Sequence, residues 1–146
     1  MLMSYTLGAW VAVEGDRAFD KAVRARRRAG LARRFRRGCA ECARLVVHET
    51  QALTRAGAAR GLRDIPLDAI TGSLEPNRAA EFDNEFRPSP GMRRRWVSVW
   101  QAEQRGTLLP PISVAAVGEA YAIRDGHHRV SVARARGALS ITAVVA

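Results

Sequence analysis

Hydrophobic and polar residues follow a regular order in the C-terminal part of the chain. Two apolar runs, Ile112–Val117 and Ala120–Arg124, flank Gly118-Glu119, so they predict an antiparallel hairpin with a tight turn. Residues His127–Arg136 then carry apolar side chains at helical spacing and predict a helix that ends at a glycine. A last apolar run, Ile141–Val145, predicts a closing strand.

The patterns before this hairpin are shorter. Ile65–Ile70 alternates like a strand, and Pro66 restricts that strand to an edge or a strand start. Thr71–Ser73 is typical of a turn, and residues 77–86 are compatible with a helix. Residues 87–91 contain two prolines and predict a loop, because proline lacks an N–H donor and disfavours the helical conformation of the residue before it.

A further helix is predicted over residues 92–105. Trp96 and Trp100 lie one turn apart on one face, which is more typical of a core than of a base-stacking pair, and Gly106 is expected to end the helix. The cluster Arg93–Arg95 at the helix start opposes the helix dipole and is therefore a weak indication of a phosphate site.

The N-terminal region also has helical spacing. Asp16 is a candidate N-cap, and residues 16–56 are predicted to form two or three helical segments with breaks near Gly30 and Gly38. Residues 56–64 are rich in small side chains and indicate a connection. The apolar positions of the first part of this region are Phe19, Ala22, Val23, Leu31 and Phe35.

The balance of residue types indicates one soluble domain with an appendage. The chain has 146 residues, of which 47% are hydrophobic and 26% are charged, which excludes a multidomain enzyme and a disordered chain. We therefore expect a basic helical N-terminal segment over residues 1–60, followed by an α/β domain over residues 61–146 with a small mixed sheet and flanking helices.

Positive charge is concentrated in one segment. Lys and Arg total 24 against 14 Asp and Glu, a net charge of +10, and residues 17–37 hold most of that excess. Two interpretations of this arginine-rich segment stay open: it tracks a nucleic-acid backbone, or it is a solvated helix face enriched in arginine by genome composition. The candidate nucleic-acid contacts are Arg24, Arg26, Arg27, Arg28, Arg33, Arg34, Arg36 and Arg37.

Targeting and redox signals are few. The uncharged run at residues 1–13 is shorter than the roughly 20 residues of a membrane-spanning helix and lacks the features of a signal peptide, so it predicts a strand or a docking segment.

Cys39 and Cys42 have the spacing of a zinc half-site. The simpler interpretation is that they are two small buried residues, reduced in the cytoplasm. A cytoplasmic protein is expected.

The candidate chemistry lies where the hairpin meets the next helix. Asp125-Gly126-His127-His128-Arg129 places nitrogen-rich side chains on a first helical turn, where unpaired N–H groups and the helix dipole favour an anion such as phosphate. Gly126 permits a close approach, and Arg129 offers a fork of donors. Asp125 either caps the helix or holds a Mg²⁺ that phosphates share.

An ordered series of motifs resembles the ParB/sulfiredoxin superfamily. The series runs from Leu109–Val114 through Asp125–Arg129 and Gly137 to Ile141–Val144, with Ile65–Ile70 upstream at the position of the family's first strand. The resemblance covers residues 64–146 and implies a compact α/β domain that binds a nucleotide or phosphate at the turn that holds Gly126, His128 and Arg129. The cofactor expected for this chain is a nucleoside triphosphate or diphosphate with Mg²⁺.

Members of this superfamily use the turn in different ways, and Asp-Gly-His-His-Arg is closest to its kinase-like branch and to short bacterial members. Sulfiredoxins have a cysteine where this chain has His127, and ParB-type proteins have Gly-Glu-Arg-Arg at the turn.

The leading interpretation is a regulatory, DNA-associated nucleotide-binding module. The alternatives are a small phosphotransferase or nucleotide hydrolase, and a non-catalytic scaffold. Catalysis needs a general base, for which Glu81, Asp83 and Glu85 are candidates on the helix expected near the pocket.

Overall fold

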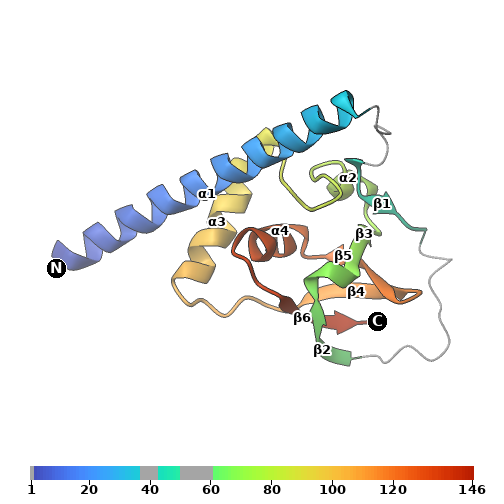
Figure 1. Cartoon of the computed structure of the whole chain (residues 1–146). Helices are drawn as coiled ribbons and strands as arrows, with labels where there is room; N and C mark the ends of the chain where they lie inside the picture. The colour runs from blue at the N-terminus through green and yellow to red at the C-terminus, as the bar shows by residue number, and fades with distance from the viewer. Residues whose placement is uncertain (1, 37–42, 50–60) are drawn as a thin grey trace.

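A six-stranded mixed sheet forms the centre of the computed structural model, which describes residues 2–36, 43–49 and 61–146. The strands lie in the order β1-β3-β5-β4-β6-β2, and helices flank the sheet (Figure 1), so the predicted α/β class with a small mixed sheet is confirmed. The helices are α1 (Leu2–Phe35), α2 (Pro76–Ala79), α3 (Arg93–Gln104) and α4 (His127–Ala135), and the strands are β1 (Val46–Val47), β2 (Gly61–Pro66), β3 (Ile70–Ser73), β4 (Ile112–Val117), β5 (Ala120–Asp125) and β6 (Ser140–Val145).

The C-terminal elements agree with their sequence patterns. Strands β4 and β5 form the predicted antiparallel hairpin, in which Val114 pairs with Ile123 and Gly118 takes a left-handed conformation at the turn. Strand β6 closes the chain parallel to β4, and β2 lies at the sheet edge beyond it. These elements are specified locally, by alternation and by turn residues.

The strand expected over Ile65–Ile70 is wrong in extent, because β2 ends at Pro66 and a 3-10 turn, Leu67–Ala69, separates it from β3. The connection expected over residues 56–64 is also wrong in part, since residues 61–64 belong to β2.

The turn expected at Thr71–Ser73 is wrong, because these residues belong to β3. Strand β3 runs parallel between β1 and β5, so its main-chain groups are paired on both sides. Gly72 allows β1 to come close, since a Cβ atom there would lie 2.7 Å from the carbonyl oxygen of Val46. A turn-like composition is overridden here by pairing with strands that are distant in the sequence.

The helix expected over residues 77–86 is also wrong in extent. Helix α2 ends at Ala79, and the chain then turns so that Phe82 forms an isolated bridge with Pro88. The side chain of Asp83 supports these turns, because its Oδ1 accepts hydrogen bonds from the backbone N–H groups of Glu85 (3.0 Å) and Arg87 (2.8 Å). A carboxylate that bonds nearby N–H groups favours a turn over a helix.

Helix α1 differs from the prediction at its start. It begins at Leu2 rather than at Asp16, which lies in mid-helix and pairs with Arg93 of α3. The uncharged N-terminal run is thus helical, and the helix also continues through Gly30. The helical pattern expected up to residue 56 is wrong beyond α1, because Val46 and Val47 form β1 and pair with β3. Close packing compensates the flexibility of Gly15, where a Cβ would lie 3.0 Å from Cγ1 of Val97 on α3.

The buried face of α1 is narrower than its sequence suggested. Phe19 and Val23 are buried against the domain, whereas Leu31 and Phe35 are 52% and 86% exposed, which corrects their assignment to an inward face. Figure 1 shows α1 crossing α3, with the N-terminal turns of the helix extending beyond the rest of the molecule. Residues before and after position 60 thereby contribute to one core, and the division of the chain at residue 60 stays a prediction.

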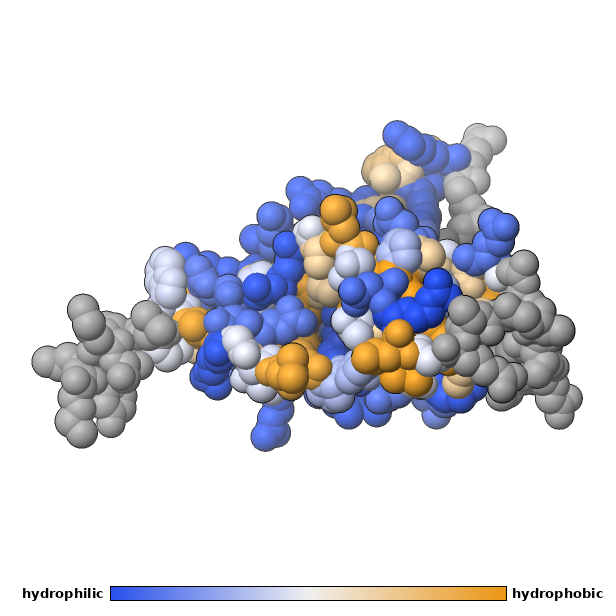
Figure 2. All heavy atoms as spheres, turned by 90° about the horizontal axis from the view of Figure 1, so that it is seen from below, coloured by the Kyte–Doolittle hydropathy of each residue, from blue (hydrophilic) through white to orange (hydrophobic). Residues whose placement is uncertain are grey.

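The main core lies on the face of the sheet that the helices cover. Val114 and Ile123 of the hairpin pack there with Val130 of α4 and Trp96 of α3. A smaller apolar cluster occupies the opposite face. Seen from below, exposed apolar residues form separate patches divided by hydrophilic residues (Figure 2). None of the helices formed by the described residues combines the length and the apolar character needed to cross a membrane.

Candidate anion-binding site at the start of helix α4

The turn between β5 and α4 has the geometry that its sequence predicted. Gly126 is the N-cap of α4 with φ of 116°, a left-handed conformation that favours glycine. A Cβ at this position would lie 2.7 Å from Cβ of Ile112, so the close packing also requires glycine. Helix α4 then begins at His127, and the N–H groups of its first turn have no intrahelical acceptor, which makes them donors for an anion.

A cavity of about 310 Å³ lies at this helix start. It is lined by Gly126, by both histidines and by arginines from three separate elements. Arg129 comes from α4, Arg78 from α2 and Arg95 from α3. The sequence pattern had indicated Arg95 within its arginine cluster, but it missed Arg78, which carries no local motif.

The guanidinium of Arg129 is already engaged. Its Nη1 donates to the carbonyl oxygens of Pro110 and Pro111, the latter at 3.0 Å. Its Nη2 donates to Oδ2 of Asp125 at 3.0 Å. Arg129 therefore fixes the segment before β4 against the start of α4 and forms one wall of the cavity.

Asp125 is an exposed partner of Arg129 rather than a helix cap. Its carboxylate is 80% exposed, and no side-chain hydrogen bond caps α4 within the described structure. It is the one acidic side chain among the described residues that line the cavity.

Among residues 2–36, 43–49 and 61–146, no group of three or more His, Cys, Asp or Glu side chains is placed to hold a metal ion.

His127 is buried and connects α4 to the sheet. Its Nε2 lies 2.6 Å from Oγ of Ser73 on β3, and its ring stacks on Phe82 at a centroid distance of 6.2 Å. Burial, and then the positive charges of Arg78 and of a protonated His128, lower the pKa of His127 to about 4. His127 is thus neutral near pH 7 and anchors the turn.

His128 lies beside the cavity without a hydrogen-bond partner for either ring nitrogen among the described residues. Its Nε2 is 3.8 Å from Oε2 of Glu81, and its ring meets Phe82 edge to face at 5.1 Å. Burial lowers the pKa of His128 to about 4, and the charges of Arg95 and Arg78 contribute to this shift. The two arginines thus place positive charge close to the ring of His128.

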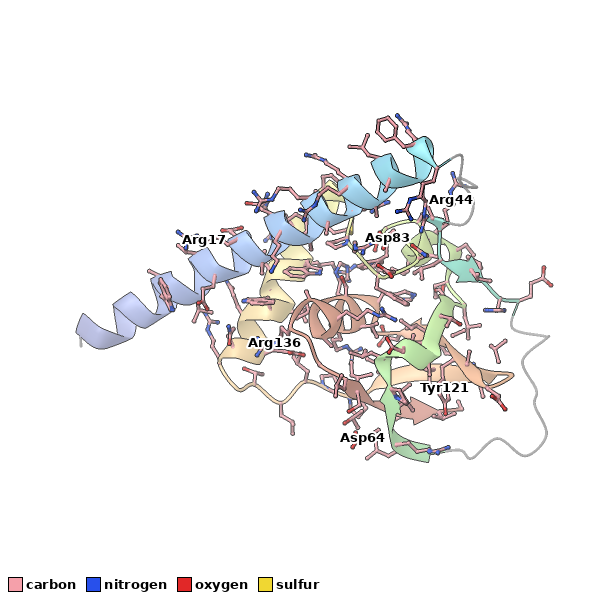
Figure 3. All side chains as sticks on the ribbon, viewed as in Figure 1. Arg17, Arg44, Asp64, Asp83, Tyr121 and Arg136 are labelled. Atoms are coloured by element: carbon pink, nitrogen blue, oxygen red, sulfur yellow. The ribbon has the colours of Figure 1, made fainter. Side chains whose placement is uncertain are left out.

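The three candidate bases lie in different surroundings. Glu81 lies next to His128, and its Oε2 is buried without a hydrogen-bond partner among the residues described. Asp83 is committed to its turn and to an ion pair with Arg87, and Figure 3 shows it near Arg44 beneath the C-terminal half of α1. Glu85 pairs with Arg87 on the surface, away from the cavity. Of this set, only Glu81 has described contacts to residues of the cavity lining, namely to His128 and to Arg78 (3.6 Å), although it does not itself line the cavity.

The arginine-rich segment forms the C-terminal half of α1. Arg26 donates to the carbonyl oxygen of Glu81 (3.4 Å) and Arg33 to Oδ1 of Asn84 (3.0 Å), so these two side chains hold α1 against the domain. Arg37, Cys39 and Cys42 lie outside the described residues. The remaining candidates are exposed: Arg24, Arg27, Arg28, Arg34 and Arg36.

Comparisons with known proteins bear on the fold. No protein-family model matches the chain, and a search of the curated proteins finds no match. Among solved structures, a sulfiredoxin from Arabidopsis thaliana is similar, with a TM-score of 0.43 and 19% sequence identity over 58% of this chain and 83% of that chain. The functional argument rests on the site itself.

Proposed function

We propose that the protein binds the phosphate groups of a small nucleotide in the cavity at the start of α4. One observation carries the proposal: three arginines from three elements and a helix N-terminus line the same cavity of about 310 Å³. Unpaired helix N–H groups and guanidinium groups are the donors that phosphate oxygens prefer. Only one carboxylate lies among the described lining residues, and it is paired with Arg129.

The arginines have different roles in this proposal. Arg129 is bonded to backbone carbonyls and to Asp125, so it shapes the wall of the cavity and contributes charge. Arg95 is exposed on the first turn of α3 and makes no described ion pair, so it is free to move toward a phosphate. Arg78 is half-buried on α2, and its Nη1 lies 3.6 Å from Oε1 of Glu81, so it must exchange this ion pair to bind a phosphate. Asp125 is the carboxylate in this cavity that could contact a Mg²⁺ ion bound to the nucleotide. A single carboxylate is compatible with a Mg²⁺ ion whose other ligands are phosphate oxygens and water.

Calorimetric titration of the full chain tests this function. CTP, ATP and ADP are each added with and without Mg²⁺, and at least one is expected to bind with a Kd in the micromolar range. Arg95→Ala is expected to weaken binding about tenfold, because a charge-assisted hydrogen bond contributes roughly 1.5–3 kcal/mol. Arg105→Ala is the matched control, since this exposed arginine follows the last turn of α3. Absence of binding by all three nucleotides overturns the proposal.

A phosphotransferase activity is a second candidate, favoured by the position of Glu81. The buried Oε2 of Glu81 is 3.8 Å from Nε2 of His128 at the edge of the cavity. In such a reaction the hydroxyl of an acceptor attacks the terminal phosphorus, the nucleoside diphosphate leaves, and Glu81 takes the hydroxyl proton. Phosphorus NMR of a bound triphosphate follows turnover, and Glu81→Gln is expected to abolish turnover while nucleotide binding is retained. A bound triphosphate that is never turned over excludes this candidate and leaves the binding module.

Association with nucleic acid is the remaining part of the proposal, and it concerns the exposed arginines of α1. Arg24, Arg27 and Arg28 lie within two turns of one helix and make no described ion pair. Such a row of cations is expected to contact successive phosphates and to release counterions. Nucleotide bound at α4 would then regulate a protein held on nucleic acid through α1.

A further inference from the structure

A second cavity, of about 550 Å³, lies between α1, α4 and the segment 85–88. It shares no residue with the cavity at the start of α4. Part of its wall is apolar, formed by Phe86, Pro88 and the small side chains of Ala18 and Ala22 on α1. Alanines four residues apart leave room under one helix face, and the volume is that of ordinary small-molecule sites, about 300–1,000 Å³.

One of two stacked indoles carries a buried donor that has no acceptor among the described residues. The rings of Trp96 and Trp100 stack with centroids 5.7 Å apart and planes 15° apart. Nε1 of Trp96 donates to Oγ of Ser131 at 2.8 Å. Nε1 of Trp100, which lines the cavity, is buried and has no acceptor among the described residues. An unsatisfied buried donor costs about 1–3 kcal/mol, so a bound acceptor at this atom stabilises the protein.

Arg134 supplies a second donor of the same kind. Its Nη2 donates to the carbonyl oxygen of Leu67 at 3.0 Å, and its guanidinium lies 5.5 Å from the ring centroid of Phe86, so the group is held in place. Its Nε is nevertheless buried without an acceptor among the described residues. Two residues that line one cavity thus each carry a buried donor without a described acceptor.

Charge around the cavity favours an anion. Arg17 and Lys21 of α1 line it together with Arg87 and Arg134, and Figure 3 shows Arg17 on α1. The single acidic side chain among the described lining residues, Glu85, is already paired with Arg87. The acceptor that this cavity lacks is therefore expected to carry negative charge.

We propose that this cavity is a second ligand site, which takes a small organic carboxylate with a flat apolar body. The carboxylate accepts hydrogen bonds from Nε1 of Trp100 and Nε of Arg134, and Lys21 adds long-range attraction. The flat body packs against Phe86 and the alanines of α1. The ligand would bridge α1 to α4 and thereby hold the arginine-bearing helix on the domain.

Titration with 2-naphthoate tests this site in the full chain labelled with ¹⁵N. The chain contains three tryptophans and therefore gives three indole N–H resonances, and Trp100→Phe identifies the one that belongs to Trp100, which lines the cavity. A saturable downfield shift of the Trp100 resonance is expected, because its N–H gains a charged acceptor, while the Trp96 resonance moves less. The neutral analogue 2-naphthylmethanol is expected to bind at least tenfold more weakly.

Variants separate this site from its alternatives. Trp100→Phe keeps the aromatic stack but removes the donor, and a tenfold loss of naphthoate affinity is expected. Lys21→Gln is expected to weaken binding about threefold, whereas Arg28→Gln, an exposed substitution on the same helix outside the cavity, leaves it unchanged. An unshifted Trp100 resonance, or equal binding of the neutral analogue, overturns the proposal. Loss of naphthoate binding in Arg95→Ala places the ligand at the α4 cavity and also overturns it.

Discussion

Gly126 packs directly against Ile112, so that a Cβ atom on the glycine would lie 2.7 Å from Cβ of the isoleucine. Ile112 is fully buried at the start of β4 and cannot retreat without moving the sheet. The turn that begins α4 is therefore fixed both by its left-handed backbone and by the strand behind it. The position of the candidate phosphate donors depends on this contact.

Gly126→Ala is expected to destabilise the protein by about 2–4 kcal/mol, because a left-handed alanine costs roughly 1–2 kcal/mol and overpacking adds 1–3. Urea unfolding followed by circular dichroism measures the change. Gly91→Ala is the control, since no described atom lies within 4 Å of a Cβ there and its φ is not left-handed. Equal stability of the two variants contradicts the packing account.

The pair formed by Ser73 and His127 holds α4 on β3. Ser73→Ala removes the 2.6 Å contact to His127 and the 2.9 Å hydrogen bond from the N–H of Glu75. Since a buried polar group loses its partner, the free energy of unfolding is expected to fall by about 1–3 kcal/mol. Thr71→Ala, an exposed change in the same strand, is expected to cost less than about 1 kcal/mol. Comparable losses in the two variants show that the contact is not important.

Acid pH is expected to destabilise the protein through buried His127 and partly buried His128. The pKa of His127 and of His128 is about 4 in the folded chain, against 6.5 ordinarily, so the unfolded chain binds more protons between these values. The free energy of unfolding therefore falls as the pH decreases from about 6.5 to 4, by an amount on the order of 1–3 kcal/mol per histidine. His128→Gln is expected to reduce this dependence in urea unfolding series, and an unaltered pH profile argues against the shift.

Arg129 and Asp125 are expected to affect ligand binding in opposite directions. Arg129→Ala removes a cation and releases the carbonyls of Pro110 and Pro111, so nucleotide affinity and stability both fall. Asp125→Asn removes the negative charge beside the cavity and is expected to raise metal-free affinity for ADP about threefold. Asp68→Asn, exposed in the short 3-10 turn after β2, serves as the control in calorimetry. Weaker metal-free binding by Asp125→Asn contradicts this electrostatic account.

The exposed arginines of α1 give a prediction that depends on salt. The triple variant R24Q/R27Q/R28Q is expected to lower the slope of log affinity for duplex DNA against log salt by roughly 2–3, because each phosphate contact contributes about 0.9. Fluorescence anisotropy with labelled duplex measures the slope. The triple variant R63Q/R105Q/R124Q changes the net charge equally at exposed positions elsewhere. If both triples lower the slope alike, net charge rather than α1 is responsible.

Part of the candidate site was predictable because it is local. The hairpin, the Asp125-Gly126 turn and the helix start follow from alternation and turn residues within a few positions, and their boundaries agree with the structure. The general base was left open among Glu81, Asp83 and Glu85, because the helix expected over residues 77–86 gave no reason to prefer one of these three carboxylates. The turn formed by Asp83 separates these acids and leaves Glu81 beside His128.

The sequence by itself determined the α/β class, the basic helix and the glycine turn, since each depends on short-range periodicity or on the conformational freedom of one residue. Only the tertiary structure decided that Thr71–Ser73 is a strand, that α1 begins at Leu2, and that Arg78 and Arg95 meet Arg129 around one cavity. The reason is physical: strand pairing and cavity walls join residues tens of positions apart, and their free energy appears only once the sheet and helices are assembled.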